Sequence, residues 1–209
     1  MSDQTLVSPE AVASVESAPA PVSSESPPAP TAPPASHKTL WREIIETLLL
    51  TALIYVGVNL ATGRFRIESV SMMPNLQPGE YVLVDKVSYH FVGPQRGDIV
   101  VFHHPLGERD LIKRVIGLPG ETIEISNGVV NINGQPIDEP YIAAPPGGGG
   151  SWTLGPTQLF VMGDNRNNSS DSRAWGPLER DLLIGKTLFI YWPPSGWGLV
   201  PHYTYAASN

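Results

Sequence analysis

The pattern of hydrophobic and polar positions divides the chain into three stretches. Residues 47–63 form a run of 17 uncharged residues, TLLLTALIYVGVNLATG. After Arg66 the chain changes to short runs rich in β-branched and aromatic residues, separated by turn-forming residues. Residues 1–36 show neither pattern: they hold eight of the 22 prolines, no aromatic residue, four acidic residues and no Lys or Arg. The pattern therefore predicts a tail, one apolar helix and a β-rich domain.

The tail, residues 1–38, is predicted to be disordered. Its few apolar residues cannot offset the entropy lost on ordering. The segment PPAPTAPP (Pro27–Pro34) favours an extended polyproline II conformation, which suits a spacer or a docking segment for an SH3-like partner.

The apolar run predicts a transmembrane helix over residues 39–63. Its length is at the short end of the roughly 17–25 residues that cross a bilayer, and Trp41 suits the interface. Glu43 and Glu46 count against it, because a carboxylate in hydrocarbon is costly. A buried amphipathic helix and a cleaved signal peptide are the alternatives, but a signal peptide begins near the N-terminus. Basic residues stand on both sides of the run, so charge gives no orientation.

Residues 64–209 are predicted to form a mainly β, antiparallel domain. Asn127-Gly128 is a strong signal for a two-residue hairpin, and Asn133-Gly134 marks a further turn. The segment Ala144–Ser151, APPGGGGS, is predicted to be a flexible surface loop, and it lacks the G-K-[ST] ending of a phosphate-binding loop. The predicted strand regions are Tyr81–Tyr89, Asp98–His104, Leu111–Leu118, Glu121–Ile137, Leu159–Asp164 and Leu182–Trp192.

Composition narrows the possible functions. A net charge of −7 argues against a nucleic-acid partner, because such binding relies on Lys and Arg. The chain has no cysteine, which excludes disulfides and Cys-based metal sites. Its five histidines show no metal-ligand spacing such as H-E-x-x-H. We expect no metal, no cofactor and no nucleotide.

Two serines and a lysine are candidates for chemistry. In an extended strand residues i and i+2 share a face, so Ser69 and Ser71 are expected to point the same way. A serine needs a base to become a nucleophile. Lys113 shares its predicted strand face with Leu111 and Val115, and burial there would favour a neutral amine that can act as a base. The alternative is a lysine whose stem is buried and whose ammonium reaches water.

A third candidate is the polar segment GDNRNNSSDSRAWG (Gly163–Gly176), which follows a predicted strand. Its side chains can bond backbone groups and orient one another. The alternative is an ordinary polar surface loop. On residue type alone, an Asp171–Arg173 pair could equally support a site or be solvated.

Four motifs together carry a resemblance to a known family. SVSMMPNL, GDIVVF, LIKRVIGLPGE and GDNRNNSSDSRAWG occur in the order and spacing of the sequence boxes of the bacterial type I signal peptidases. The resemblance extends from the apolar helix to Trp192–Pro194. Glu68 departs from the proline that many members have there, which bears on the local backbone. Asn75 stands where Thr is frequent, a departure expected to have little consequence.

The resemblance implies roles for individual residues. It makes Ser71 the nucleophile and Lys113 its general base. Ser69 matches a hydroxyl that, with the Ser71 N–H, stabilises the oxyanion. The remaining matched positions are supporting ones: Met72 beside the catalytic groups, Ser169 orienting the base, and Asp171 and Arg173 as an ion pair.

The same resemblance implies the reaction and its place. The chain would remove signal peptides from secretory preproteins after Ala-x-Ala-like sites, through an acyl-enzyme. It would be held in the plasma (inner) membrane by a single helix, with the β-domain on the extracytoplasmic side and the tail in the cytoplasm. Its partners would be preproteins and the lipid bilayer.

Two other interpretations of the sequence compete with this one. A Ser-His-Asp hydrolase could use His90, His103 or His104, although no G-x-S-x-G motif is present. A membrane-tethered β-barrel binding module would treat the serines as incidental and would have no proteolytic activity.

Overall fold

The computed structural model describes residues 37–205. The helix α1 (His37–Ala61) already includes the last two residues of the predicted tail. The rest of that tail, with its polyproline segment, lies outside the described residues. So do residues 206–209 of the predicted β-rich domain.

Helix α1 carries the apolar run. Its segment Leu40–Ala61 is long and apolar enough to cross a membrane, with a mean hydropathy of 1.9 and none of it buried within the protein. The helix ends two residues before the predicted boundary, because strand β1 (Thr62–Arg66) begins at once. The Thr62 hydroxyl donates to the carbonyl of Val58, and Lys86 N–H donates to that of Ala61. These bonds satisfy carbonyl groups at the helix end.

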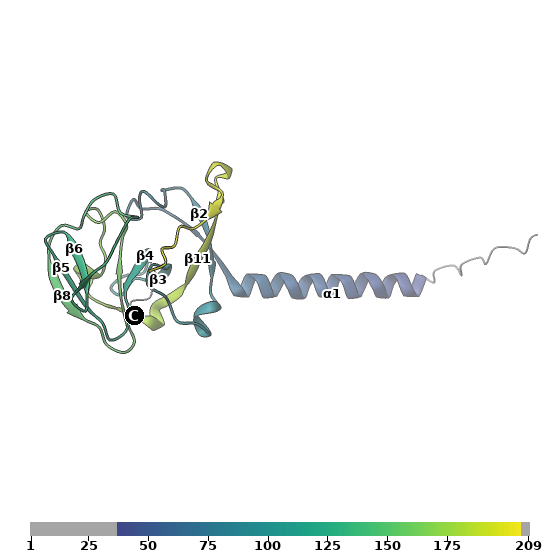
Figure 1. Ribbon diagram of the computed structural model, residues 1–209. Coiled ribbons are helices and arrows are strands. Elements are labelled where there is room, and N and C mark those ends of the chain that lie inside the picture. The colour runs from purple at the N-terminus through teal and green to yellow at the C-terminus, as the bar shows by residue number, and fades with distance from the viewer. Residues whose placement is uncertain (1–36, 206–209) are drawn as a thin grey trace, which may run out of the picture. The chain divides into compact units, whose positions relative to one another are not determined.

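The domain that follows is mainly antiparallel β-sheet, as predicted, and its strands form two sheets (Figure 1). The larger sheet has the order β1-β2-β11-β3-β4-β9-β10, with β12 also paired to β11. Its remaining strands are β2 (Tyr81–Asp85), β3 (Ile99–His103), β4 (Asp110–Gly117), β9 (Gln158–Met162), β10 (Leu178–Glu179), β11 (Leu183–Trp192) and β12 (Gly198–Leu199).

The smaller sheet has the order β7-β6-β5-β8 and gathers at one side of the domain (Figure 1). The predicted hairpin joins β5 to β6, with Ser126 opposite Val129. Asn127 and Gly128 both have positive φ, 51° and 76°, which a two-residue turn of this kind requires. The four strands are β5 (Thr122–Ser126), β6 (Val129–Ile132), β7 (Gln135–Pro136) and β8 (Gly150–Thr153).

Short helical turns fill some of the connections. Strand β2 is shorter than predicted, because the Asp85 carboxylate accepts hydrogen bonds from the N–H groups of Val87 and Ser88 and turns the chain out of the sheet. The helical elements after α1 are α2 (Ser172–Trp175) and the 3-10 turns η1 (Ser88–His90), η2 (Arg180–Leu182) and η3 (Pro194–Gly196).

The loop prediction for Ala144–Ser151 was wrong at its end. Gly150 and Ser151 belong to β8, which pairs with β5. Glycine normally disfavours strands, but here the position of the Gly150 Cβ is occupied by the ring of Trp152 two residues on.

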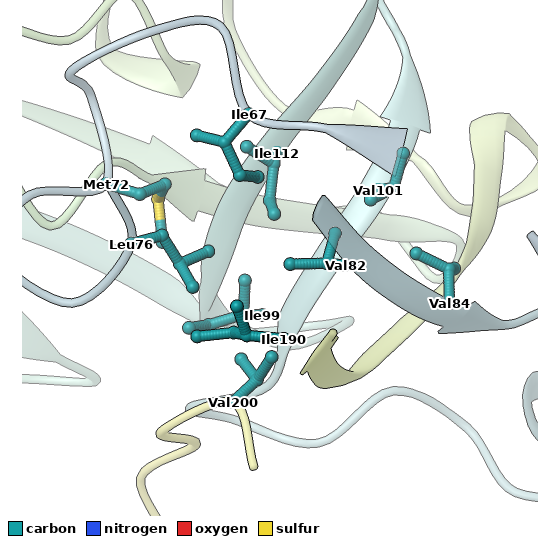
Figure 2. Close-up of a cluster of buried hydrophobic side chains, with 10 residues drawn as sticks. All are labelled: Ile67, Met72, Leu76, Val82, Val84, Ile99, Val101, Ile112, Ile190 and Val200. Atoms are coloured by element: carbon teal, nitrogen blue, oxygen red, sulfur yellow. The ribbon is translucent and has the colours of Figure 1, made fainter. Parts of the chain in front are cut away.

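One hydrophobic cluster lies under the segment that follows β1. Figure 2 shows Met72 and Leu76 on one side of it and Val82 and Val84 of β2 on the other. All four side chains are fully buried. Burial of such side chains stabilises a fold by about 1.5–3 kcal/mol each, so the segment carrying Met72 and Leu76 is firmly attached to the sheet.

Candidate active site

Ser71 begins a tight turn rather than lying in an extended strand. The Asn75 and Leu76 N–H groups both donate to the Met72 carbonyl at 3.0 Å, closing the turn. Strand β1 ends at Arg66, so the strand argument used to pair the two serines does not apply here. Their predicted proximity is nevertheless present, since Ser69 Oγ lies 3.0 Å from Ser71 Oγ.

Lys113 lies in β4, opposite Val100 of β3. The residue is only 3% exposed, so its ammonium does not reach water and the buried interpretation is confirmed. Its Nζ donates a hydrogen bond to Ser71 Oγ at 2.6 Å. Burial lowers the pKa of Lys113 from its ordinary 10.5 to about 8, although the carboxylates of Asp171 and Asp164 act in the opposite direction. A neutral amine is therefore accessible near neutral pH.

Asp171, at the end of the loop after β9, forms an ion pair with Arg173 of α2. Arg173 donates through Nε and Nη2 to the two carboxylate oxygens of Asp171, each at 2.8 Å. Burial alone would raise the pKa of Asp171, but the bonds from Arg173 and the Gly163 N–H hold that pKa below its usual range. Asp171 also caps helix α2. The pair is therefore part of the folded framework and not a solvated surface contact.

Ser169 reaches the site across Gly163. A Cβ on Gly163 would overlap both the Ser169 Oγ and the Ser71 carbonyl oxygen, so these two atoms lie close together beside the glycine. Within the described part of the chain, the Ser169 Oγ is buried and makes no hydrogen bond. It is close enough to Asp171 to lower that residue's pKa further, without the geometry of a bond. A buried hydroxyl without a hydrogen-bond partner lowers the stability of the fold, which makes Ser169 a candidate for a functional role.

A buried hydrogen-bond network that the sequence did not reveal connects the strand of Lys113 with the turn that follows Ser71. Arg114, fully buried, donates to both oxygens of Asp164 at 2.8 and 2.7 Å. Asn75 Nδ2 donates to the same Asp164 carboxylate at 2.7 Å and to the Tyr141 carbonyl at 2.8 Å. Asp164 thus joins the strand that carries Lys113 to the turn that follows Ser71.

The structure places Asn75 in this network, and the expectation that Asn in place of Thr has little consequence stays a prediction. Arg114 alone carried a usable signal: it alternates with Lys113 on a strand flanked by apolar residues, and a buried guanidinium needs a carboxylate. Nothing in the sequence shows which of the 20 acidic residues supplies it.

The three histidines considered for a Ser-His-Asp arrangement bond elsewhere. His103 Nδ1 lies 2.7 Å from Asp110, His104 Nδ1 accepts from the Leu106 N–H, and His90 Nδ1 contacts the Val87 carbonyl. The Ser71 hydroxyl instead contacts Lys113 and Ser69.

A cavity of about 350 Å³ is lined by Ser69, the neighbour of Ser71. One wall is the segment from Phe65 to Ser69, and the other comes from Val101 and residues 109–112 at the start of β4. Apolar side chains such as Ile67 and Ile112 form much of the surface, and Ser69 stands at its edge. The cavity is large enough to hold part of an extended peptide beside Ser69.

Comparisons with known proteins show which family the chain is similar to. Residues 40–192 match the family described as signal peptidase, peptidase S26. A probable signal peptidase I-1 from Synechocystis sp. is 45% identical over 184 residues, covering 81% of this chain and 93% of the relative. A signal peptidase I from Leptolyngbya laminosa is 41% identical over 170 residues, covering 75% and 82%. A crystal structure of a signal peptidase I from Enterococcus faecalis is 32% identical, covers 46% of this chain and 97% of its own, and has a TM-score of 0.43.

The chain belongs to the peptidase S26 family of signal peptidases. Within that family its relatives are of the signal peptidase I type, so the chain is a hydrolase of the protease class.

Proposed function

We propose that this protein cleaves signal peptides from secretory preproteins with Ser71 as nucleophile and Lys113 as general base. The observation that carries the proposal is the 2.6 Å contact between Lys113 Nζ and Ser71 Oγ in a buried setting. The lowered pKa of Lys113, about 8, supports the role of base, because a neutral amine can take the hydroxyl proton.

The reaction then follows in two halves. Lys113 Nζ takes the proton of Ser71 as Oγ bonds to the scissile carbonyl carbon. The C–N bond breaks, and the proton passes from Lys113 to the leaving amine, which leaves an ester on Ser71. Lys113 next takes a proton from water, the resulting hydroxide equivalent attacks the ester carbon, and Ser71 Oγ regains its proton as the signal peptide departs.

Three groups support these steps. The Ser71 N–H and the Ser69 hydroxyl are proposed to hold the oxyanion, and donors of this kind each contribute roughly 10²–10³ in rate. The unpartnered hydroxyl of Ser169 is proposed to orient the Lys113 amine. Met72, fully buried below the turn, together with the Asp171–Arg173 pair, keeps these groups in place.

The first cavity supports selection of small apolar residues before the cut, as in Ala-x-Ala. Its apolar lining, which includes Ile67, Val101 and Ile112, suits apolar side chains. Helix α1 supports a single-span tether in the plasma membrane, with the β-domain on the extracytoplasmic side where exported preproteins emerge. Both the enzyme and the apolar segment of its substrate would then be held at one bilayer.

The test is cleavage of a preprotein carrying an Ala-x-Ala site by the purified full chain in detergent. Ser71→Ala and Lys113→Arg should each lower the rate by about 10⁴-fold or more while keeping the wild-type circular dichroism spectrum. Ser170→Ala, a change at an exposed serine of the same loop as Ser169, is the matched control. Equal product from wild type and Ser71→Ala would refute the nucleophile. No cleavage by folded wild type would favour a binding module.

A further inference from the structure

A second cavity, of about 420 Å³, lies beside the site and shares no residue with the first. One wall comes from the smaller sheet: the glycine segment 147–149 together with Trp152 of β8. The other wall comes from the segment after β9: Asn167 and Ser169 of the loop, and Arg173 and Ala174 of α2. The cavity thus lies where the small sheet meets the loop that carries the proposed base-orienting serine.

The two walls are tied together by Asn167. Its Oδ1 accepts from the Gly147 N–H at 2.8 Å, and its Nδ2 donates to the Pro145 carbonyl at 3.1 Å. Trp152 is also held in place, because its ring packs 4.8 Å from that of Phe160 and lies over Gly150, where any Cβ would overlap it. Its position is therefore fixed before any ligand arrives, which lowers the entropic cost of binding.

The position of Ser169 connects this cavity to the chemistry. Its Oγ and the Ser71 carbonyl oxygen both lie next to the Cβ position of Gly163, so the Ser169 wall of the second cavity lies close to the backbone of the nucleophile. The first cavity approaches it from the Ser69 side. A polypeptide bound across Ser71 has one segment before the scissile bond and one after it. The two segments must extend from Ser71 on different sides.

We propose that the second cavity binds the segment on the carboxyl side of the scissile bond, the first residues of the mature protein. This inference rests on the proposed function. The first cavity, on the Ser69 side, is assigned to the residues before the cut. The segment after the cut is therefore assigned to the cavity on the Ser169 side.

The chemistry of the walls fits a leaving segment of varied sequence. Two guanidinium groups line the cavity, but Arg173 is paired with Asp171 and Arg166 with Glu139. With its charges neutralised, the cavity has no strong preference for charge. Strand β8 is an edge strand, and an edge can pair with the main chain of an extended peptide. Recognition of the main chain, with Trp152 as an apolar platform, accepts many sequences.

The test uses two peptide substrates that are identical up to the cut and end either one or six residues after it. For the full-length wild type in detergent, kcat/KM for the long substrate should exceed that for the short one by about 10-fold or more. Trp152→Ala removes the platform and Ala174→Trp fills the cavity. Each should lower the long-to-short ratio about fivefold or more, the scale of losing a well-packed contact residue. Val129→Ala, in the same sheet but outside the cavity, is the control.

The outcomes separate this inference from the proposed function. Ser71-dependent cleavage with equal kcat/KM for both wild-type substrates would overturn the leaving-segment site and keep the peptidase. A ratio that stays at the wild-type value in Ala174→Trp would also overturn it and leave the cavity to another occupant. Equal loss for both substrates in both variants would show a structural role only. Failure of wild type to cleave either substrate would overturn both proposals.

Discussion

Replacing Lys113 with methionine should abolish activity and yet stabilise the protein at neutral pH. Methionine has a similar length and suits a buried site, whereas the lysine must lose its proton or hold a charge where water is excluded. Lys113 is 3% exposed, and burial lowers its pKa from 10.5 to about 8. The buried active site therefore disfavours the charged form of Lys113.

The magnitude follows from linkage. Between about pH 8 and 10.5 the unfolded chain keeps the proton and the folded chain does not, so Lys113 makes stability rise with pH through that window. Below about pH 8 Lys113 is protonated in both states, so the folded protein carries the full free-energy cost of burying the charged amine. One pKa unit corresponds to about 1.36 kcal/mol, so this cost at pH 7 is on the order of 3 kcal/mol. Lost hydrogen bonding to Ser71 offsets about 1 kcal/mol of the gain from substitution.

The assay is chemical denaturation of wild type and Lys113→Met in detergent at pH 7 and pH 11. Unfolding is monitored by tryptophan fluorescence. The stability difference between Lys113→Met and wild type should shift by about 3 kcal/mol in favour of wild type as pH rises from 7 to 11. Lys86→Met controls for the loss of a lysine outside the site. A difference that is the same at both pH values would refute the argument that Lys113 pays a desolvation cost.

Three further results are expected. In a pH profile, kcat/KM should rise with pH to a plateau with a midpoint near 8, the pKa of Lys113 in the free enzyme; a flat profile from pH 6 to 10 would contradict it. Gly163→Ala should destabilise by about 1–3 kcal/mol and reduce activity, because its Cβ overlaps two oxygens of the site. Gly198→Ala, where no atom lies within 4 Å of the new Cβ, should match wild type in melting temperature and rate. Arg114→Met should cost about 3–5 kcal/mol in denaturation by leaving Asp164 buried without its partner, and Arg114→Met with Asp164→Leu should recover part of that loss.

The sequence predicted the β-rich domain and its hairpin well, because these depend on local signals. Asn127-Gly128 specifies positive φ at both turn positions, and only a few turns permit that. The apolar helix was predictable for the same reason. By contrast, β8 was missed because GSWT has no alternating pattern, and its pairing with β5 depends on where the preceding loop places it.

For the site, the motif resemblance singled out Ser71 and Lys113, and strand alternation predicted that Lys113 is buried. Proximity of Ser69 and Ser71 was predicted by strand alternation, but the structure achieves it through a turn. The Asn75–Asp164–Arg114 network was beyond reach, because its partners are separated by 89 and 50 positions and no local pattern pairs them. Sequence indicates which groups can react, whereas their mutual placement depends on tertiary contacts.

The arrangement of these contacts along the chain matters for how the protein comes into being. Ser71 meets its amine 42 residues later in the sequence, and Arg114, next to that amine, donates both to Asp164 and to the carbonyl of Pro201. A chain made from its N-terminus exposes the serine long before the residues that activate it have been synthesised. Ser71 therefore remains an ordinary hydroxyl until Lys113 has been made and has packed against it. The reactive pair thus arises only with tertiary folding, and an unfolded chain carries no activated serine.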